Sequence, residues 1–464
     1  MAFLQRQINR GSVSTGYEVA NSLKTEPDNG ERFVTGDIFT NYSSVRKFTV
    51  STWLKRTEIT VQSLIWFNSN TNTSVQLEFN AADKLSFLLQ DNVGNGVESY
   101  ALTQGVFRDT SAYYHVILAV DTTQGTAANR TKIYINGVNQ TLVQGNGSYD
   151  TFPAQNYDVP LQTRHYLLGY DGSNNGFRGY VAEYYFLDGI AASPTDLGEF
   201  DEDSGIWKPI EYTGNYGTEG YYMNFSDSAN MGKDHGPNAQ GNGFADPYGI
   251  AAADQSTDTP TNNFATTNPL YKYGSETFTT EGATVVTKNA NGWVSPQSTI
   301  CPASGKWYME FKFNAVDSRV VGAAPIGGTL WNSAQHYGGT VGSNSVGYAD
   351  TGYLYVNDSG ISSNYGPSYD NSNIIAVALD MDNGYIYWAK DNTWINSANP
   401  VSGSGGYALP AGLVEHSIGA SIYQQAKQSF ANFGGYTTIS ISSAQTDANG
   451  YGTFEYAPPS GYYA

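Results

Sequence analysis

The stretch Ile374–Trp394, IIAVALDMDNGYIYWAKDNTW, constrains the fold more than any other part of this sequence. Within it, Asn383-Gly384 separates two runs of apolar, β-branched and aromatic residues. Both turn residues adopt positive φ at little cost, so the pair favours a two-residue type I′ turn between antiparallel strands. Such a turn would place Leu379 opposite Trp388 on one buried face of a sheet. The sequence therefore predicts an antiparallel hairpin whose aromatic residues belong to a core.

Strand-like runs of the same kind recur along the chain. Asn136-Gly137 carries a second type I′ signal within TKIYINGVNQTL, residues 131–142. The other predicted strands lie at 47–55, 63–67, 74–79, 84–90, 114–121, 165–170 and 179–187, and then at 305–313, 345–348, 352–356, 414–423 and 429–433. Many short strands at regular spacing, separated by turn residues, are typical of β-sandwiches. The sequence thus predicts an all-β protein.

The composition agrees with this fold class and limits the partners. Only 14% of the residues are charged, whereas the chain has 51 Gly and 36 Tyr, a balance that favours strands and tight turns over helices. The formal net charge is −19 and no Lys/Arg cluster occurs. This charge opposes a nucleic-acid-binding face and charge-driven docking to anionic membranes. Neutral or cation-bearing ligands fit it better.

The number of cysteines and the N-terminal residues indicate the cellular compartment in which the protein is made. Cys301 is the single cysteine, so no intrachain disulfide forms. The start, MAFLQRQINRGSVSTG, lacks the apolar stretch of a signal peptide, and no apolar run is long enough for a membrane span. We therefore expect a protein that is made and assembled in a cytoplasm.

The pattern divides the chain into four parts. Residues 1–22 have little periodicity and are predicted to form an N-terminal arm, with a frayed terminus as the alternative. Residues 23–204 and 271–464 each carry a set of strands and are predicted to form one sandwich each. Residues 205–270 are rich in Gly, Asn, Asp and Pro, so we expect an extended connector that lies partly along the sandwich surfaces.

Two parts of the chain resemble known domain families. Residues 45–190 resemble the laminin-G-like branch of the concanavalin-A-like lectin/glucanase superfamily, through FTVSTWLKR, the VILAVD…KIYINGV pair and RGYVAEYYFLDG. Residues 305–464 resemble a SPRY domain, through GKWYMEFKF, the DNG hairpin, SFANFG and TFEYAPPSGYYA. Both resemblances imply jelly-roll or concanavalin-A-like β-sandwiches. The order of the two domains, with the MAFLQRQINRG start, is similar to structural fibre-type proteins of tailed bacteriophages.

A glycan-binding surface is the first candidate for a functional site. Sugars dock on exposed aromatic faces that neighbouring amides and carboxylates support with hydrogen bonds. Aromatic residues lie in loops of the second domain that are rich in Gly, Asn and Ser: Trp331, Tyr337, Tyr353, Tyr365 and Tyr369. Because Tyr is abundant throughout this chain, the alternative is that these are ordinary loop residues.

The sequence signals for catalysis and for metal binding are weaker. A glucanase strand of the form Glu-x-Asp-x-x-Glu would place two carboxylates on one face, but Glu199-Phe200-Asp201 is followed by Ser204 at the last position. A solvated acidic helix end is the better interpretation, since the segment follows a predicted short helix that begins at Ser193, and no catalytic residue is predicted. Asp171, Asn174 and Asn175 would offer oxygen ligands to calcium, with a plain Gly/Asn turn as the alternative. The sequence predicts no cofactor, and calcium stays open.

These observations and the bacteriophage resemblance lead to one functional hypothesis. We expect a non-enzymatic virion protein, a tail fibre or fibre tip, that binds host-surface glycans or a protein receptor and docks to other virion proteins through residues 1–22. The resemblance implies a homo-oligomer, with a trimer favoured. The alternatives are a capsid-decorating head fibre, a secreted carbohydrate-binding lectin and, last, a glycosidase on a lectin-like fold.

Overall fold

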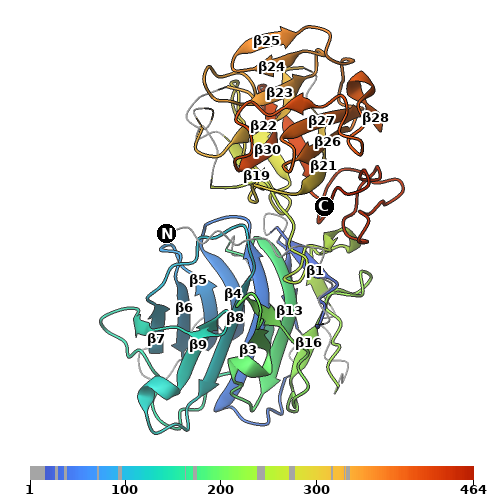
Figure 1. Cartoon of the computed structure of the whole chain (residues 1–464). Helices are drawn as coiled ribbons and strands as arrows, with labels where there is room; N and C mark the ends of the chain where they lie inside the picture. The colour runs from blue at the N-terminus through green and yellow to red at the C-terminus, as the bar shows by residue number, and fades with distance from the viewer. Residues whose placement is uncertain are drawn as a thin grey trace.

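The alternation of apolar and polar residues produces antiparallel strands throughout the chain, and these strands form two β-sandwiches that lie one above the other in Figure 1. The computed structural model describes residues 16–26, 30–35, 39–70, 73–91, 97–161, 164–170, 175–237, 246–270, 277–314, 317–328, 330 and 335–464. Within these ranges helical residues occur only in short 3-10 turns, and no helix has the length or apolarity to cross a membrane. The prediction of an all-β protein with two jelly-roll-like domains is confirmed.

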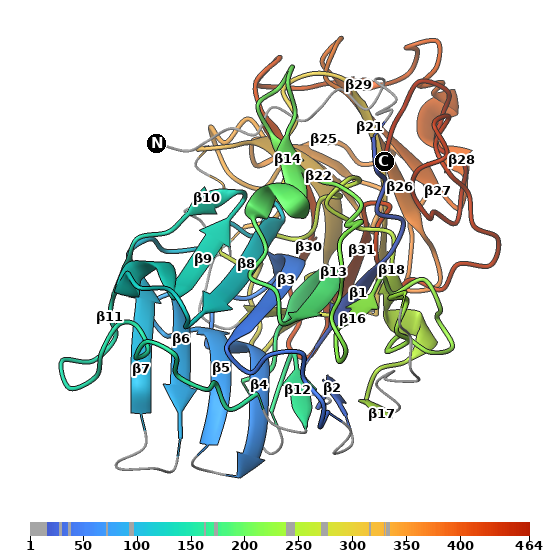
Figure 2. The same cartoon turned by 90° about the horizontal axis from the view of Figure 1, so that it is seen from below.

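The first sandwich consists of two sheets, which Figure 2 shows as separate layers. Sheet I has the order β10 (Val138–Asn139), β9 (Thr131–Ile135), β8 (Tyr114–Asp121), β3 (Lys47–Arg56), β13 (Gly179–Asp188), β1 (Ser22–Thr25) and β18 (Gln255–Ser256), with β16 (Tyr221–Met223) also paired to β13. Sheet II has the order β11 (Leu142–Gln144), β7 (Val97–Thr103), β6 (Leu85–Gln90), β5 (Thr73–Phe79), β4 (Gln62–Asn70), β12 (His165–Leu167), β2 (Arg32–Val34) and β17 (Asp246–Tyr248). Their facing sides bury one apolar core that includes Phe48, Leu118 and Phe186 from sheet I and Phe67 and Leu77 from sheet II.

The second sandwich repeats this plan. Sheet III has the order β19 (Thr277–Thr280), β20 (Val285–Lys288), β31 (Gln428–Asn432), β21 (Lys306–Phe313), β26 (Ile375–Asp380), β27 (Tyr385–Lys390) and β28 (Thr393–Trp394), with β29 (Tyr407–Ala408) paired to β27. Sheet IV has the order β25 (Ser359–Ser362), β24 (Leu354–Val356), β23 (Val346–Ala349), β22 (Arg319–Pro325) and β30 (His416–Ile422). Trp388 lies in the core between them, as its position in the predicted hairpin indicated.

The two hairpins that the sequence predicted differ in their turns. At Asn136-Gly137, Ile135 pairs with Val138 and both turn residues have positive φ (48° and 76°), so the two-residue turn is confirmed. The prediction for the hairpin at 374–394 is wrong in its register. Trp388 pairs with Val377 instead of Leu379, because a longer loop follows β26.

The Asp380 side chain explains the longer loop between β26 and β27. Its carboxylate accepts hydrogen bonds from the backbone N–H groups of Asp382 (3.1 Å) and Asn383 (3.0 Å). In this loop Gly384 has a positive φ (76°) and Asn383 does not, so the turn is not type I′. The register differs by two residues from the predicted one, and an even shift leaves the same side chains facing the core.

The segment predicted as a connector, residues 205–270, supplies strands to both sheets of the first sandwich. β16 pairs with β13, β18 pairs with β1, and β17 pairs with β2 at the edge of sheet II. Another piece, β15 (Trp207–Pro209), pairs with β14 (Gly198–Phe200) in a small ribbon of its own. Polar composition did not reveal these pairings, because two- and three-residue strands carry almost no periodicity. The predicted domain boundaries at residues 22, 204 and 270 stay predictions.

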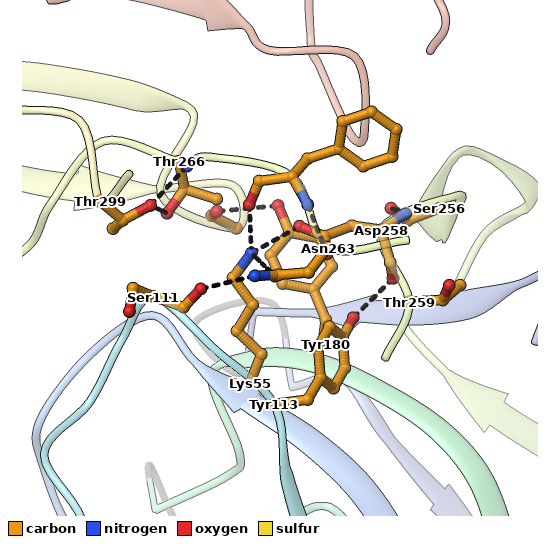
Figure 3. A network of polar contacts seen from close by, with 12 residues as sticks. Lys55, Ser111, Tyr113, Tyr180, Ser256, Asp258, Thr259, Asn263, Thr266 and Thr299 are labelled. Atoms are coloured by element: carbon orange, nitrogen blue, oxygen red, sulfur yellow. Dashed lines mark hydrogen bonds and ion pairs between the residues drawn. The ribbon is translucent and has the colours of Figure 1, made fainter. Parts of the chain in front are cut away.

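Buried polar contacts join the two sandwiches, and Figure 3 shows their central network. Lys55 on β3 donates to Asp258 (2.7 Å), to the Asn263 side chain (2.8 Å) and to the backbone carbonyl of Phe264 (2.7 Å). The Lys55 and Asp258 side chains are 0% and 1% exposed. A buried ion pair is stable only when further hydrogen bonds satisfy both partners, and this network supplies them.

Two further contacts cross from the first sandwich to the β19–β20 hairpin of the second. The Tyr180 hydroxyl donates to the carbonyl of Gly282 (2.8 Å), and Lys24 pairs with Glu281 (2.9 Å). The Tyr436 hydroxyl, also from the second sandwich, donates to the same Glu281 carboxylate (3.1 Å). These contacts, with the network around Lys55, fix the two sandwiches against each other.

Candidate functional site

The five aromatic residues proposed from sequence have very different surroundings. Tyr353 is 38% exposed, Tyr365 is half-buried, and Tyr337 and Tyr369 are buried, at 0% and 4% exposed. Trp331 lies outside the described residues. Among the four described residues of this set, Tyr353 is therefore the most exposed.

Tyr337 is a structural residue on the outer face of sheet IV. Its ring lies over glycines of three neighbouring strands, where a Cβ atom at Gly322 or Gly419 would come within 2.7 Å of Tyr337 side-chain atoms. A Cβ atom at Gly347 would lie 2.3 Å from the Tyr337 carbonyl oxygen. The Tyr337 hydroxyl donates to the carbonyl of Pro296 (2.7 Å), so its polar end is satisfied inside the protein. A glycine inside a strand often marks a place where another part of the chain packs closely on the sheet. Gly322, Gly347 and Gly419 were therefore the sequence signal that a residue such as Tyr337 is buried here.

Tyr369 and Tyr365 close one end of the second core. The Tyr369 hydroxyl lies within hydrogen-bond distance of the carbonyl oxygens of Arg319 (3.2 Å) and Tyr348 (3.1 Å). The Tyr365 ring packs edge-on against Trp388, with the ring centroids 5.7 Å apart, and burial raises the pKa of its hydroxyl to about 12. Both rings belong to the core, so neither presents an open face to a ligand.

Tyr353 instead belongs to a chain of partly exposed rings, which we call the aromatic strip. The strip consists of Tyr423, Trp293, His336, Tyr355 and Tyr353. Consecutive ring centroids are 5.5, 4.6, 4.9 and 5.9 Å apart in that order. Trp293, His336 and Tyr355 are half-buried, and Tyr423 is 39% exposed. Neighbouring rings from Tyr423 to Tyr355 meet edge to face, at 64–69°, so they do not form one flat platform; the exposed part of each ring is a surface against which a sugar ring can pack.

The strip is assembled from segments that are distant in the sequence. Tyr423 directly follows β30, Tyr355 lies on β24, and Trp293 lies in the loop after β20. The Gly292 N–H donates to the Tyr423 carbonyl (2.9 Å), and Val294 and Ile422 exchange backbone hydrogen bonds. These bonds hold the Trp293 loop against the end of β30, so the two rings meet in a fixed geometry.

His336 adds a polar group to the middle of the strip. Its Nδ1 lies 2.8 Å from the carbonyl oxygen of Tyr337, so Nδ1 carries the proton and donates. Burial lowers the pKa of the His336 ring, which favours the neutral form. In this tautomer Nε2 is an acceptor, and no described residue donates to it. The strip therefore offers one hydrogen-bond acceptor between its aromatic faces.

An open depression of about 510 Å³ lies at the Tyr423 end of the strip. It is lined by one aromatic ring and by small polar, amide and charged side chains: Asn291, Asp317, Ser318, Tyr423, Gln424, Gln425 and Lys427. Gln424 donates through its amide to the Asp317 carboxylate, and the Gln425 N–H donates to the Asn291 side chain (2.9 Å). These hydrogen bonds connect the three loops that form the walls. The combination of a ring with fixed amides and a carboxylate suits the hydroxyl groups of a sugar.

Two loops of this depression hold residues in a costly backbone conformation. Ser318 and Ala426 have φ of 60° and 56°, in the left-handed region that non-glycine residues rarely occupy. Ala426 has no side-chain hydrogen bond to offset this strain, although its N–H donates to the carbonyl of Lys288 (2.7 Å). Such strain persists where the surrounding structure enforces it, and it concentrates at functional sites.

The first sandwich has a smaller aromatic group on the outer face of sheet II. Trp66 on β4 stacks on Tyr170, with ring centroids 4.5 Å apart, and Tyr166 on β12 packs edge-on against Tyr170 at 5.3 Å. Trp66 and Tyr166 are cross-strand partners. The aromatic strip is the longer row of rings and adjoins a polar depression, so we regard it as the better candidate.

The structure shows no paired catalytic carboxylates at the position that the sequence raised. Glu199 and Asp201 both pair with Lys208, at 3.3 and 3.2 Å. Asp201 also accepts hydrogen bonds from Ser204, and these bonds together lower its pKa to about 2. A carboxylate with a lowered pKa is a poor general acid. The predicted helix end is wrong: Glu199 and Phe200 lie on β14, preceded only by a 3-10 turn at Pro194–Asp196, and Asp201 follows the strand.

The described residues contain no group of three or more His, Cys, Asp or Glu side chains that could hold a metal ion. Of the three residues considered for calcium, Asp171 and Asn174 lie outside the described residues. Asn175 is described, and its backbone carbonyl accepts a hydrogen bond from the Ser63 N–H (2.7 Å). The calcium hypothesis stays a prediction.

Sequence reasoning missed Trp293, His336, Tyr423 and the polar residues of the depression. Trp293 follows Asn291-Gly292, a turn signal of the same kind that drew attention to the other loop aromatics. Tyr423 was placed inside a predicted strand, whereas β30 ends one residue before it. The signal for the strip was therefore present in part, but the contacts that bring these residues together are tertiary.

Comparison with known proteins gives a family match for the first sandwich. Residues 29–196 match the family model of the concanavalin A-like lectin/glucanases superfamily, in its laminin-G-like form. This confirms the laminin-G-like resemblance at the level of the superfamily. No curated protein matches the chain at a significant level.

Solved structures with a similar architecture share little sequence with this chain. The SPRY domain of human HERC1 is 15% identical to this chain. The match spans 36% of this chain and 96% of the HERC1 chain, with a TM-score of 0.28. The heptameric SAP-like pentraxin from Limulus polyphemus is 11% identical, with coverage of 44% and 93% and a TM-score of 0.28. A putative carbohydrate binding protein from Bacteroides ovatus is 13% identical, with coverage of 47% and 56% and a TM-score of 0.33.

Proposed function

We propose that this protein is a non-enzymatic virion component, a tail fibre or fibre tip, that binds host-surface glycans through the aromatic strip of its second sandwich. The strip is the observation that carries the glycan-binding part. It combines partly exposed rings, a neutral histidine acceptor and an adjoining polar depression held by fixed hydrogen bonds. The lectin-type family match of residues 29–196 supports a carbohydrate-binding role for the molecule.

The virion part of the proposal is supported by the resemblance of the domain order to fibre-type proteins of tailed bacteriophages. Residues 17–25 are already fixed to the first sandwich: the Tyr17 hydroxyl donates to Glu183 (2.8 Å), and β1 pairs with β13. Docking to other virion proteins is proposed through residues 1–22, of which residues 17–22 lie against this sandwich and keep Glu18 and Ala20 exposed. Weak individual sugar sites suffice on a particle, because a trimer in many copies raises the effective concentration.

A glycan array with purified full-length protein tests sugar binding. We expect wild type to bind a subset of glycans and Trp293→Ala/Tyr423→Ala to lose at least about tenfold in affinity, since each stacked ring contributes on the order of 1 kcal/mol. Trp66→Ala, on the other sandwich, is the matched control and should retain binding. Equal binding by wild type and the double variant would remove the strip from the proposal.

Immunogold labelling of particles tests the virion assignment and separates its alternatives. Label on the tail supports a fibre or fibre tip. Label on the capsid would indicate a head fibre, and protein found only outside particles would indicate a secreted lectin. Release of reducing sugar from bound glycans, abolished by substitution of one carboxylate, would overturn the non-enzymatic assignment.

A further inference from the structure

The depression beside Tyr423 keeps several hydrogen-bond donors unused, together with one buried acceptor, the Gln424 Oε1 atom, that has no partner among the described residues. One Asp317 oxygen and the Asn291 side-chain oxygen already accept hydrogen bonds, from Gln424 and from the Gln425 N–H. The Asn291 amide therefore has its N–H₂ group left to donate. The hydroxyl of Ser318 and the ammonium group of Lys427 add further donors to the lining.

Lys427 is the cation of this lining, and no described carboxylate lies within ion-pair distance of it. Lys427 is half-buried in the wall of the depression. A half-buried cation beside unused N–H and O–H donors is complementary to an anionic acceptor group. Asp317 lies in the same depression, but one of its two oxygens is occupied by the Gln424 amide.

The net charge of −19 does not decide this local preference. At physiological ionic strength the Debye length is about 8 Å, so distant surface carboxylates are largely screened from the depression. The groups within the depression then determine which ligand charge is favoured. Their arrangement is fixed by the strained loops at Ser318 and Ala426 and by the hydrogen bonds between the walls.

Resting on the proposed glycan-binding function, we propose that this depression binds an anionic sugar unit, one that carries a carboxylate or a sulfate, at the end of a glycan that lies along the aromatic strip. Lys427 pairs with the anionic group, and Asn291 donates to it or to a neighbouring hydroxyl. Tyr423 is shared by both surfaces and stacks on the sugar ring. Lys427 is thus the residue that determines specificity, whereas the strip supplies affinity for neutral and anionic glycans alike.

The test compares glycans that differ only in charge. An array that carries neutral, carboxylated and sulfated forms of the same oligosaccharides is probed with wild type and with Lys427→Gln. We expect wild type to prefer an anionic form about tenfold, because a hydrogen bond to a charged group contributes more than one to a neutral group. Lys427→Gln should reduce this preference to nearly one, because it weakens binding of the anionic form more than binding of the neutral form. The carboxylated and sulfated arms identify which anion is used.

Two further variants make the result specific to charge. Lys427→Arg should retain the preference, and Asp317→Asn, which keeps the acceptor for Gln424 but removes the negative charge, should strengthen it. Thermal unfolding of each variant checks that the fold is intact. Raising the salt concentration should weaken binding of the anionic form more than binding of the neutral form.

The outcomes distinguish this inference from the proposed function. Equal binding of neutral and anionic forms by wild type, with loss of both in Trp293→Ala/Tyr423→Ala, overturns the anionic preference and leaves glycan binding in place. An anionic preference that persists in Lys427→Gln overturns the role of Lys427. Absence of binding to every glycan by folded wild type overturns both proposals.

Discussion

The outer faces of sheet I and sheet IV are both formed by antiparallel strands, but the face of sheet I is covered by other parts of the chain and the face of sheet IV is covered only in part. On sheet I, the residues after β13 and the residues around Val19 cover the strands, and they bury two aromatic clusters with Tyr185, Tyr212 and Trp53. On sheet IV, the loop that carries Tyr337 packs on the outer face and buries this ring, whereas the rings of the aromatic strip beside it stay partly exposed.

The polar groups on the two faces differ in the same way. Sheet I buries Lys55, His115 and Glu183 and satisfies each of them from within the protein. The depression beside sheet IV keeps Lys427 without a carboxylate partner among the described residues. A face whose polar groups are satisfied internally contributes stability, whereas a face with unused polar groups is available to a ligand. The comparison predicts that substitutions on sheet I change stability and that substitutions on the depression change binding.

The largest effect should come from Asp258→Ala at the Lys55 network. This substitution leaves a buried ammonium group without its counter-charge, and breaking a buried ion pair costs about 3–5 kcal/mol in the free energy of unfolding. Chemical denaturation followed by fluorescence measures it. Lys427→Gln is the matched control on the depression and should change the same quantity by less than about 0.5 kcal/mol. A similar small change for both variants would contradict the comparison.

The second effect concerns Glu183, which lies at a β-bulge of β13 with φ of 51°. Its carboxylate accepts hydrogen bonds from the hydroxyls of Tyr17 (2.8 Å), Tyr185 (2.9 Å) and Tyr222 (2.8 Å). Glu183→Ala removes the shared acceptor and leaves buried donors unsatisfied, so we expect a loss of about 2–3 kcal/mol.

Limited proteolysis gives a second readout for the same variant. Because the Tyr17 hydroxyl then keeps only its contact with the Tyr222 hydroxyl (3.1 Å), cleavage near residue 17 should become faster in Glu183→Ala than in wild type. Glu183→Gln, which keeps one acceptor oxygen, should lie between the two. Unchanged cleavage with lowered stability would show that Glu183 supports the sheet and does not hold the N-terminal segment.

The third effect is a pH dependence that arises from His115. Its Nδ1 accepts from the Trp207 indole N–H (2.9 Å), its ring stacks on Trp53, and burial lowers its pKa to about 3. The folded protein therefore binds this proton less readily than the unfolded chain, whose histidine pKa is about 6.5. Its contribution to stability is complete above about pH 6.5 and decreases as the pH falls toward 3, by at most about 1.4 kcal/mol per pH unit.

Denaturation of wild type and His115→Gln across this pH range isolates the contribution. The difference in unfolding free energy between the two proteins should shrink as the pH falls, since the variant lacks the titrating ring. His336→Gln on the aromatic strip is the control, and it should show a smaller pH-dependent difference because His336 is half-buried. A constant difference for His115→Gln between pH 6.5 and 3 would contradict this assignment.

The smallest effect, and the one opposite in sign, is expected for Ala426→Gly at the depression. Glycine adopts the left-handed conformation without the steric cost that alanine bears, so relief of this strain should raise the unfolding free energy by about 0.5–1 kcal/mol. Thermal unfolding measures the shift. A destabilised variant would show that the loop at 426 is not strained in solution.

Much of the framework followed from sequence because a strand repeats with a period of two. The inward face of the hairpin at 374–394 came out correctly, with Leu379 and Trp388 in the core. This held although the turn at Asn383-Gly384 was wrong, because the observed register differs by an even number of residues. The turn itself could not be predicted from its dipeptide, since the Asp380 carboxylate that holds the longer loop acts through side-chain geometry.

The candidate site was predictable only in part. Gly/Asn-rich loops pointed to Tyr353, which does lie on the aromatic strip, but the same criterion selected Tyr337 and Tyr369, which are buried. Composition does not distinguish a ring that fills a glycine groove from a ring that faces solvent. That distinction depends on which strand the loop crosses, and local composition does not record it.

The sequence by itself determined the fold class, the two sets of strands and the inward-facing residues, because local periodicity and turn chemistry specify them. The tertiary structure decided which outer faces are covered and which polar groups keep unused hydrogen-bonding capacity. Trp293, His336 and Tyr423 lie on segments separated by tens of residues. They form one surface because backbone hydrogen bonds join the loops of Trp293 and Tyr423, and the hydroxyls of Ser295 and Ser421 hold the His336 segment beside them. Contacts of that range leave no pattern in a single sequence.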